Sequence, residues 1–351
     1  MKCRKIIAGA LFVTSALFIG FTAKAQDVHF TQFNATPMTI NPAFTGAFQG
    51  DYRVSAIYRD QWREALGVAA FKTIAVSFDM PVIRDISIDD YLAIGAQLYN
   101  DRAGDGNLNN FSALASVAYH KFFGESGTAA LTVGLQAGYA NKNIDLSKLY
   151  FAGDFNNGGF VSGLDPIYNN LNNRTGAFLM NAGVAFSFAP TDKFSFVLGS
   201  GANNLTQPLE SFQKQQATKD VGLGIRYTSQ AGALIGVGER FQIRPAVLMQ
   251  TQSTAFELIG GTELLYKLGD DYTMPDAPSV FVGGWYRLMD AAMVTAGVEF
   301  NNFRIGAAYD FNTSNLKQST NGYGGFELMV QYIAPNPLQF ARRLLYPCSR
   351  F

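Results

Sequence analysis

The side chains that most often perform catalysis are scarce in this chain. Its two histidines are His29 and His120, and a hydrolytic triad would have to use one of them. The sequence has no Gly-x-Ser-x-Gly elbow, no His-Glu-x-x-His motif and no cysteine cluster that could bind zinc. His120 lies next to Phe122 and Phe123, as expected of a membrane-interface residue. We therefore predict that the protein is not an enzyme.

The strongest candidate for a metal site is the run from Asn100 to Asn107, Asn-Asp-Arg-Ala-Gly-Asp-Gly-Asn. Acidic and amide oxygens close to glycine can bind calcium, but this run lacks the closing bidentate glutamate of an EF-hand loop. A solvated turn explains it better, so we predict no metal and no cofactor. Lysine plus arginine and aspartate plus glutamate balance at 27 each, which gives no electrostatic reason to expect a nucleic-acid partner.

Most of the remaining chain alternates between apolar and polar residues. Phe326, Leu328, Val330 and Tyr332 would share one face of a strand, with Glu327, Met329 and Gln331 on the other. Strands of about ten residues with charges on one face and aromatics on the other fit a wall with lipid outside and water inside. The pattern predicts an all-β fold, a transmembrane antiparallel up-and-down β-barrel.

The alternating segments predict about fourteen strands. This even number is usual in a single-chain bacterial barrel. Their expected ranges are Tyr52–Arg63, Ala70–Met80, Tyr91–Asp101, Asn110–Lys121, Gly127–Asn141, Thr175–Phe188, Phe194–Leu205, Ile225–Val237, Phe241–Gln252, Ala255–Lys267, Val280–Leu288, Ala291–Phe300, Phe303–Asn312 and Gly322–Ile333. The two longest connections follow the fifth and seventh strands, so long loops lie at one end, and both termini are expected in the periplasm.

The predicted inward side chains carry both signs of charge, which favours ion pairs in the barrel interior over a strongly selective pore. They are Arg53, Arg59, Arg63, Gln242, Arg244, Gln250, Glu257, Glu263, Lys267, Arg287, Glu299, Arg304 and Asp310. They would line a wet or plugged lumen; a defined substrate site is the alternative.

The two ends of the chain differ from its middle. Lys2, Arg4 and Lys5, an apolar run and Ala23-Lys24-Ala25 predict a cleaved signal peptide over 1–25. We expect a periplasmic or plug segment over 26–50, the outer-membrane barrel over 51–334 and a periplasmic tail over 335–351, where Pro335 and Pro337 end the last strand. Cleavage would leave Cys348 as the sole cysteine, so no internal disulfide is expected.

Two motifs near the predicted mature N-terminus carry a family resemblance. Gln26-Asp27-Val28-His29-Phe30-Thr31-Gln32-Phe33 is followed by Pro37 and then by Asn41-Pro42-Ala43-Phe44-Thr45-Gly46. This order resembles the start of PorP/SprF proteins, outer-membrane proteins of the type IX secretion system of Bacteroidetes. The run from Asn100 to Gly104 is similar to a loop motif of that family. The ending Cys348-Ser349-Arg350-Phe351 resembles the family's Cys-Pro-Arg-Phe ending, with serine in place of proline.

The resemblance implies a non-enzymatic outer-membrane protein of a Gram-negative cell. It would dock, support the secretion of, or anchor surface cargo such as gliding adhesins, with periplasmic secretion-machine subunits and outer-membrane lipid as further partners. The alternative function is a passive porin or transporter for small or hydrophobic solutes. The sequence does not choose between a core subunit of the machine and a cargo-specific accessory.

The candidate partner-docking residues lie in the two terminal segments. Aromatic anchors outside any strand need a place to be buried, and prolines fix the path of the chain. The basic pair Arg342 and Arg343 could form one short amphipathic turn together with Leu338, Ala341 and Leu345. A packed plug without a partner and a frayed tail are the alternatives. The candidates are Phe30, Phe33, Pro37, Asn41, Pro42, Phe44, Arg342, Arg343, Cys348 and Phe351.

Overall fold

The computed structural model describes residues 30–335, except for 85, 88, 125–126, 157, 215–221, 269–276 and 316. The predicted signal peptide therefore lies outside the described residues. The same holds for the tail candidates Arg342, Arg343, Cys348 and Phe351.

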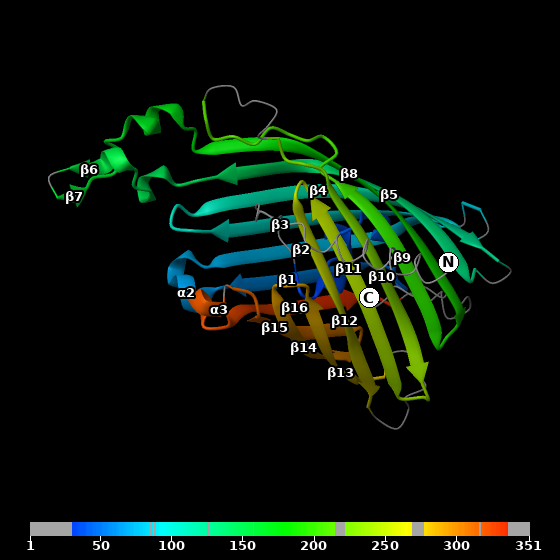
Figure 1. Ribbon diagram of the computed structural model, residues 1–351. Helices are drawn as coiled ribbons and strands as arrows, with labels where there is room; N and C mark the ends of the chain where they lie inside the picture. Colours follow the sequence, from blue (N-terminus) through cyan, green and yellow to red (C-terminus); the bar gives the residue numbers. More distant parts are fainter. Residues whose placement is uncertain are drawn as a thin grey trace, which may run out of the picture.

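Fourteen antiparallel strands close into one barrel, as predicted (Figure 1). Each strand pairs with its neighbours in the chain, and the first pairs with the last. The strands are β1 (Arg53–Gln61), β2 (Phe71–Arg84), β3 (Tyr91–Ala103), β4 (Leu108–Phe123), β5 (Ala129–Asn143), β8 (Arg174–Thr191), β9 (Phe194–Asn203), β10 (Arg226–Val237), β11 (Phe241–Gln252), β12 (Ala255–Lys267), β13 (Ser279–Arg287), β14 (Ala291–Phe300), β15 (Phe303–Asn312) and β16 (Tyr323–Ile333).

The side chains of the strands alternate between the two faces of the wall. On β16, Phe326, Leu328 and Val330 are exposed on the outside, whereas Glu327 and Gln331 are buried inside. A wall in contact with lipid requires this arrangement, because an apolar outer band replaces the polar surface of a soluble protein. No helix among the described residues is long and apolar enough to span a membrane.

The connections differ in length at the two ends of the barrel. The end that carries residues 50–52 and 334, which we call the short-turn end, is closed by tight turns such as Asn301–Asn302. Both of these asparagines have positive φ, 46° and 66°, as a tight hairpin turn requires. The connection before β3 is shorter than predicted, because β2 continues past Pro81 through an irregularity in its pairing with β3.

The opposite end, which we call the long-loop end, carries two short helices, α2 (Arg63–Leu66) and α3 (Lys317–Thr320), and a projecting arm, residues 144–173. Figure 1 shows the arm in green beyond the ends of the strands, with the hairpin β6 (Phe155–Asn156) and β7 (Gly159–Phe160). The sequence pattern did not predict this hairpin. Arg63 was predicted to face the lumen and does not. It lies on α2 with 55% of its side chain exposed, because β1 ends at Gln61.

Residues 30–48, which we call the plug, fold inside the barrel as three short 3-10 turns, η2 (Phe33–Ala35), η3 (Pro37–Thr39) and η4 (Pro42–Phe44). All but a few plug side chains are buried, and the plug packs against strands from both halves of the barrel. The core of the molecule is therefore the contact between the plug and the inner wall.

Candidate functional site: the plug and the long-loop end

The start of the plug binds the seam where the barrel closes. The backbone N–H groups of Thr31 and Gln32 donate to the carboxylate of Glu327 on β16, over 2.7 and 3.0 Å. Arg59 on β1 forms ion pairs with Glu327 and with Asp310 on β15, the latter over 2.7 Å. All five residues are buried, so the first strand, the last two strands and the plug share one charged network. A buried network of this kind holds its members in one geometry when every charge is paired.

The interior ion pairs that the sequence predicted are present. Arg244 on β11 pairs with Glu299 on β14 over 2.8 Å, and Arg304 on β15 pairs with Glu263 on β12 over 2.6 Å. On the other side of the seam, Arg53 pairs with Asp79 over 2.7 Å. Opposite charges from different strands thus compensate one another inside the wall, which leaves little net charge to select a permeating ion.

The motif from Asn41 to Gly46 is the most tightly held part of the plug. The Asn41 side chain accepts from the N–H of Ala43 over 2.9 Å and donates to the carbonyl of Val184 over 3.0 Å. It thereby caps η4 and fixes η4 to β8. Gly46 has a φ of +73° and donates its N–H to Asp79 over 2.6 Å. Glycine is required there, since a side chain would be strained and would meet Ala93.

Glycines on the inner wall make room for this motif. A Cβ added at Gly134 would lie 2.4 Å from the backbone of Pro42 and Ala43, and one added at Gly183 would lie 1.9 Å from Asn41 Oδ1. Glycine in a strand often marks close approach of another backbone, and here that backbone is the plug. This contact between the plug and the wall was not predictable from the sequence, because the residues lie far apart along the chain.

His120 is a plug contact and not the membrane-interface residue that the sequence suggested. It is fully buried, stacks on Tyr91 at 4.2 Å between ring centroids, and its Nε2 lies 2.8 Å from the carbonyl oxygen of Thr45. A carbonyl only accepts, so Nε2 carries hydrogen and donates. The alternation of β4, in which Ser116 and Ala118 also face inward, was the signal that could have placed His120 inside.

The six N-terminal docking candidates lie together in the plug. Phe30, Phe33, Pro37, Asn41, Pro42 and Phe44 are all buried by the inner wall. Phe33, for example, packs edge-on against Trp285 of β13 at 5.5 Å between ring centroids. The barrel of this chain itself therefore buries these side chains, and in this conformation they are not accessible to a partner. Their role in docking stays a prediction.

The arm at the long-loop end is organised around the buried carboxylate of Asp154. Asp154 accepts hydrogen bonds from the N–H groups of Phe151, Leu164 and Asp165 and from the hydroxyl of Tyr168, over 2.7 to 3.0 Å. Burial alone would raise the pKa of Asp154, but these donors lower it to about 2. At neutral pH Asp154 is therefore charged, and the hydrogen bonds that it accepts hold the arm in one conformation.

Large apolar side chains are exposed on this ordered arm. Phe155 and Phe160 meet edge-on at 5.2 Å between centroids, and Tyr150 lies 5.7 Å from Phe160. Each of the three is more than half exposed. Rigid, exposed aromatic residues are typical of the centres of protein interfaces, because they bury much area at little cost in side-chain entropy.

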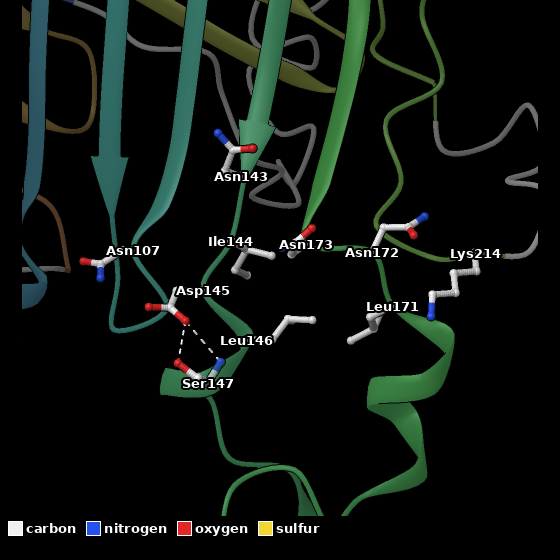
Figure 2. A pocket seen from close by; sticks show the side chains of 10 residues that line it. All are labelled: Asn107, Asn143, Ile144, Asp145, Leu146, Ser147, Leu171, Asn172, Asn173 and Lys214. Atoms are coloured by element: carbon white, nitrogen blue, oxygen red, sulfur yellow. Dashed lines mark hydrogen bonds between the residues drawn. The ribbon is translucent and has the colours of Figure 1, made fainter.

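A pocket of about 670 Å³ lies at the base of the arm (Figure 2). Asp145 hydrogen bonds to the N–H and hydroxyl of Ser147, and Lys214 reaches in from the loop before β10 and bonds the carbonyl of Asn169. Amide, carboxylate and aliphatic side chains are mixed around it, so it has no single chemical character. The lining residues are Asn107, Asn143, Ile144, Asp145, Leu146, Ser147, Leu171, Asn172, Asn173 and Lys214.

No group of three or more histidine, cysteine, aspartate or glutamate side chains among the described residues is arranged to hold a metal ion. The turn between β3 and β4, which includes the calcium candidate, is held by a hydrogen bond from Arg102 to the side chain of Asn107, 2.9 Å from Arg102 Nε. Arg102 therefore already donates to the side-chain oxygen of Asn107, which a bound cation would need as a ligand.

Three solved structures illustrate what the chain is similar to in shape. The toluene transporter TbuX of Ralstonia pickettii has 13% identity and a TM-score of 0.47, with 89% of this chain and 95% of that chain covered. The toluene transporter TodX of Pseudomonas putida has 11% identity and a TM-score of 0.45, with 89% and 95% covered. The KdgM porin has 9% identity and a TM-score of 0.35, with 80% and 98% covered.

Comparison with curated proteins gives no match. The family model described as "Type IX secretion system membrane protein PorP/SprF" matches residues 22–332, which includes the plug and the whole barrel. The motif that forms η4 and the strands that bury it thus fall within one family match, in agreement with the resemblance found from the sequence. This outer-membrane β-barrel belongs to the PorP/SprF family of type IX secretion system membrane proteins.

Proposed function

We propose that this protein docks and anchors secreted cargo of the type IX system, such as an adhesin, at its long-loop end. The observation that carries the proposal is the plug, which is buried inside the barrel and bonds to the wall around it. We expect a barrel that contains such a plug to act as a binding surface and not as a channel for solutes. The arm, with Tyr150, Phe155 and Phe160 exposed, supplies an ordered surface for a protein partner.

In this proposal the long-loop end faces outward and the short-turn end, with both chain termini, faces the periplasm. Single-chain outer-membrane barrels have short periplasmic turns and longer external loops. Periplasmic subunits of the secretion machine would then meet the short-turn end and the tail over 335–351. The role of the tail is tested by deleting 335–351. Unchanged barrel assembly together with unchanged cargo display would refute it.

The docking function is tested by affinity capture of the tagged protein from gently solubilised outer membrane, with bound proteins identified by mass spectrometry. We expect recovery of a large secreted surface protein, of secretion-machine subunits, or of both. Replacing Tyr150, Phe155 and Phe160 by serine should reduce recovery of the surface protein without changing assembly, since these side chains make no contact with the plug. A matched triple variant on the lipid-facing wall, Val282, Val294 and Ile305 to alanine, should retain it.

The alternative, a passive porin or transporter, makes the opposite prediction in a planar bilayer. A steady open conductance from the intact protein, with no partner recovered by capture, would favour that alternative and contradict the docking proposal.

A further inference from the structure

A second cavity, which we call the vestibule, lies inside the barrel between the plug and the long-loop end. It measures about 90 Å³, and Phe30, Phe33, Thr39 and Ile40 of the plug form its floor. Its walls come from β3, β4, β5, β8, β9, β10 and β11. Its lining is unusual in composition, because seven amide side chains face it: Gln97, Asn110, Gln136, Asn181, Asn203, Asn204 and Gln250.

Several of these amides have polar atoms that no group among the described residues satisfies. Gln97 Oε1, Gln136 Nε2, Asn203 Oδ1 and Asn204 Nδ2 are buried and have no hydrogen-bond partner among the described residues. The four side chains are each at most 5% exposed. An unpaired buried polar atom is costly, so a native protein retains one where water or a ligand satisfies it.

The orientation of two of these amides is fixed by backbone groups. The N–H of Asn204 donates to Asn181 Oδ1 over 2.8 Å, and Asn181 Nδ2 then donates to Gln136 Oε1 over 2.7 Å. A backbone N–H only donates, so this chain of bonds leaves the NH₂ of Gln136 as the unpaired group. Asn203 Nδ2 likewise faces the carbonyl of Ile40 at 3.3 Å, which directs its Oδ1 away as an unpaired acceptor.

The unpaired atoms are two acceptors, on Gln97 and Asn203, and two donors, on Gln136 and Asn204. A neutral ligand with both donors and acceptors would satisfy them, and an extended polypeptide backbone presents N–H and C=O groups in alternation. The charged side chains of the lining support a neutral ligand as well, since Lys142 and Glu210 pair with each other and Arg226 donates to the carbonyl of Thr39 over 3.1 Å. A cavity of about 90 Å³ excludes a folded module.

We propose that the vestibule binds a short extended segment of a secreted polypeptide through its main-chain amides. The proposal rests on the proposed function, which supplies a secreted polypeptide at this end of the barrel. It adds that the segment is recognised by its backbone and not by charge, and that Gln97, Gln136, Asn203 and Asn204 recognise it.

Disulfide tethering tests this in the purified full-length protein without any knowledge of the cargo. Ser112 lines the vestibule, and Cys348 is the sole cysteine outside the predicted signal peptide. In the Ser112→Cys, Cys348→Ser protein, a capped Cys-Gly-Ala-Gly peptide and 1-thioglucose are each equilibrated against 2-mercaptoethanol. Intact-protein mass spectrometry then gives the fraction of each mixed disulfide. We expect the peptide to be retained about tenfold more strongly than the sugar.

The decisive variant is Gln97→Leu on this background. Gln97 Oε1 has no hydrogen-bond partner in the part of the chain that the structure describes, so the substitution should leave the barrel at least as stable while it lowers peptide retention about tenfold. Gln136→Leu should act in the same direction. Gln331→Leu is the matched control, because Gln331 is buried on the inner wall but does not line the vestibule. Its peptide retention should not change.

Two results would overturn the proposal. Equal retention of sugar and peptide would assign the vestibule to a general polar ligand, and unchanged peptide retention in Gln97→Leu and Gln136→Leu would show that the amides do not recognise it. Capture of cargo by the wild-type protein is scored separately. Its absence would contradict the proposed function, while the tethering result would still decide the chemistry of the vestibule.

Discussion

Single residues of the plug and the wall are matched to each other at close range. Asn41, Gly46 and their neighbours form backbone turns that only a particular set of wall residues can accept, and the wall supplies glycine at Gly134 and Gly183. The contact between the plug residues and the wall glycines cannot be recognised from either segment of the sequence alone. The motif was visible as a family resemblance, but its physical reason is a contact between positions more than 80 residues apart, such as Gly134 with Pro42.

Gly134→Ala tests this fit. The new methyl group would overlap the backbone of Pro42 and Ala43, and overpacking of this kind costs about 1–3 kcal/mol. We expect that loss in the free energy of unfolding, measured by urea denaturation in lipid vesicles. Gly284→Ala is the control, because a Cβ at Gly284 meets nothing within 4 Å. Equal stability of the two variants would mean that the plug is not packed against β5.

The charge on Glu327 gives a second prediction at this scale. The N–H groups of Thr31 and Gln32 donate to different oxygens of Glu327, so Glu327→Gln replaces one of these acceptors by an NH₂ group. It also leaves Arg59 with one fewer buried charged partner. Breaking a buried pair costs about 3–5 kcal/mol. The exposed pair of Lys193 and Glu239 offers the matched control, since water screens this pair and Glu239→Gln should change the free energy of unfolding very little. The free energy of unfolding is measured by the same urea denaturation. Similar losses in the two variants would refute the inference that the buried charge network at the seam stabilises the barrel.

At the scale of elements, the arm depends on the charge of one carboxylate. The pKa of Asp154 is about 2 in the folded arm, against 3.8 for an ordinary aspartate. A lowered pKa means that the charged form stabilises the fold, so the contribution is complete above about pH 4 and is lost as the pH falls toward 2. We expect faster hydrogen exchange of 144–173 at pH 2 than at pH 4 after correction for intrinsic rates.

Asp154→Asn should show that faster exchange already at pH 7, because the amide cannot accept four hydrogen bonds as a carboxylate does. Asp145→Asn is a control in the same arm, since Asp145 is exposed and bonds only to Ser147 and Lys148 nearby. An exchange rate for Asp154→Asn like that of the control would contradict the role assigned to the carboxylate.

The strands were predictable because their signal is local. Alternation with period two gave all fourteen strands, and four of them, Phe241–Gln252, Ala255–Lys267, Ala291–Phe300 and Phe303–Asn312, have the predicted limits. The hairpin of the arm and the path of the plug were not predictable in this way. Their turns are short and aperiodic, and distant contacts, such as that of Asn41 with Val184, determine their conformation.

For the whole molecule, the plug makes a prediction about transport. The intact barrel should show little steady conductance in a planar bilayer, because buried side chains occupy the lumen between the two ends. A variant in which Asn41, Thr45 and Arg53 are replaced by alanine removes the bonds that join the plug to β8, β4 and β1, and should show frequent brief openings. Large steady currents from the wild-type protein would contradict the plugged state.

The bond between Thr31 and Glu327 joins residues 296 positions apart. The predicted signal peptide would lead export from the N-terminus, so we expect the plug to reach the periplasm before β15 and β16. Its bonds to β2 and β8 can then form early, whereas those of Thr31 and Gln32 must await the last two strands. A truncated chain that lacks β16 would leave the start of the plug without its acceptor on Glu327.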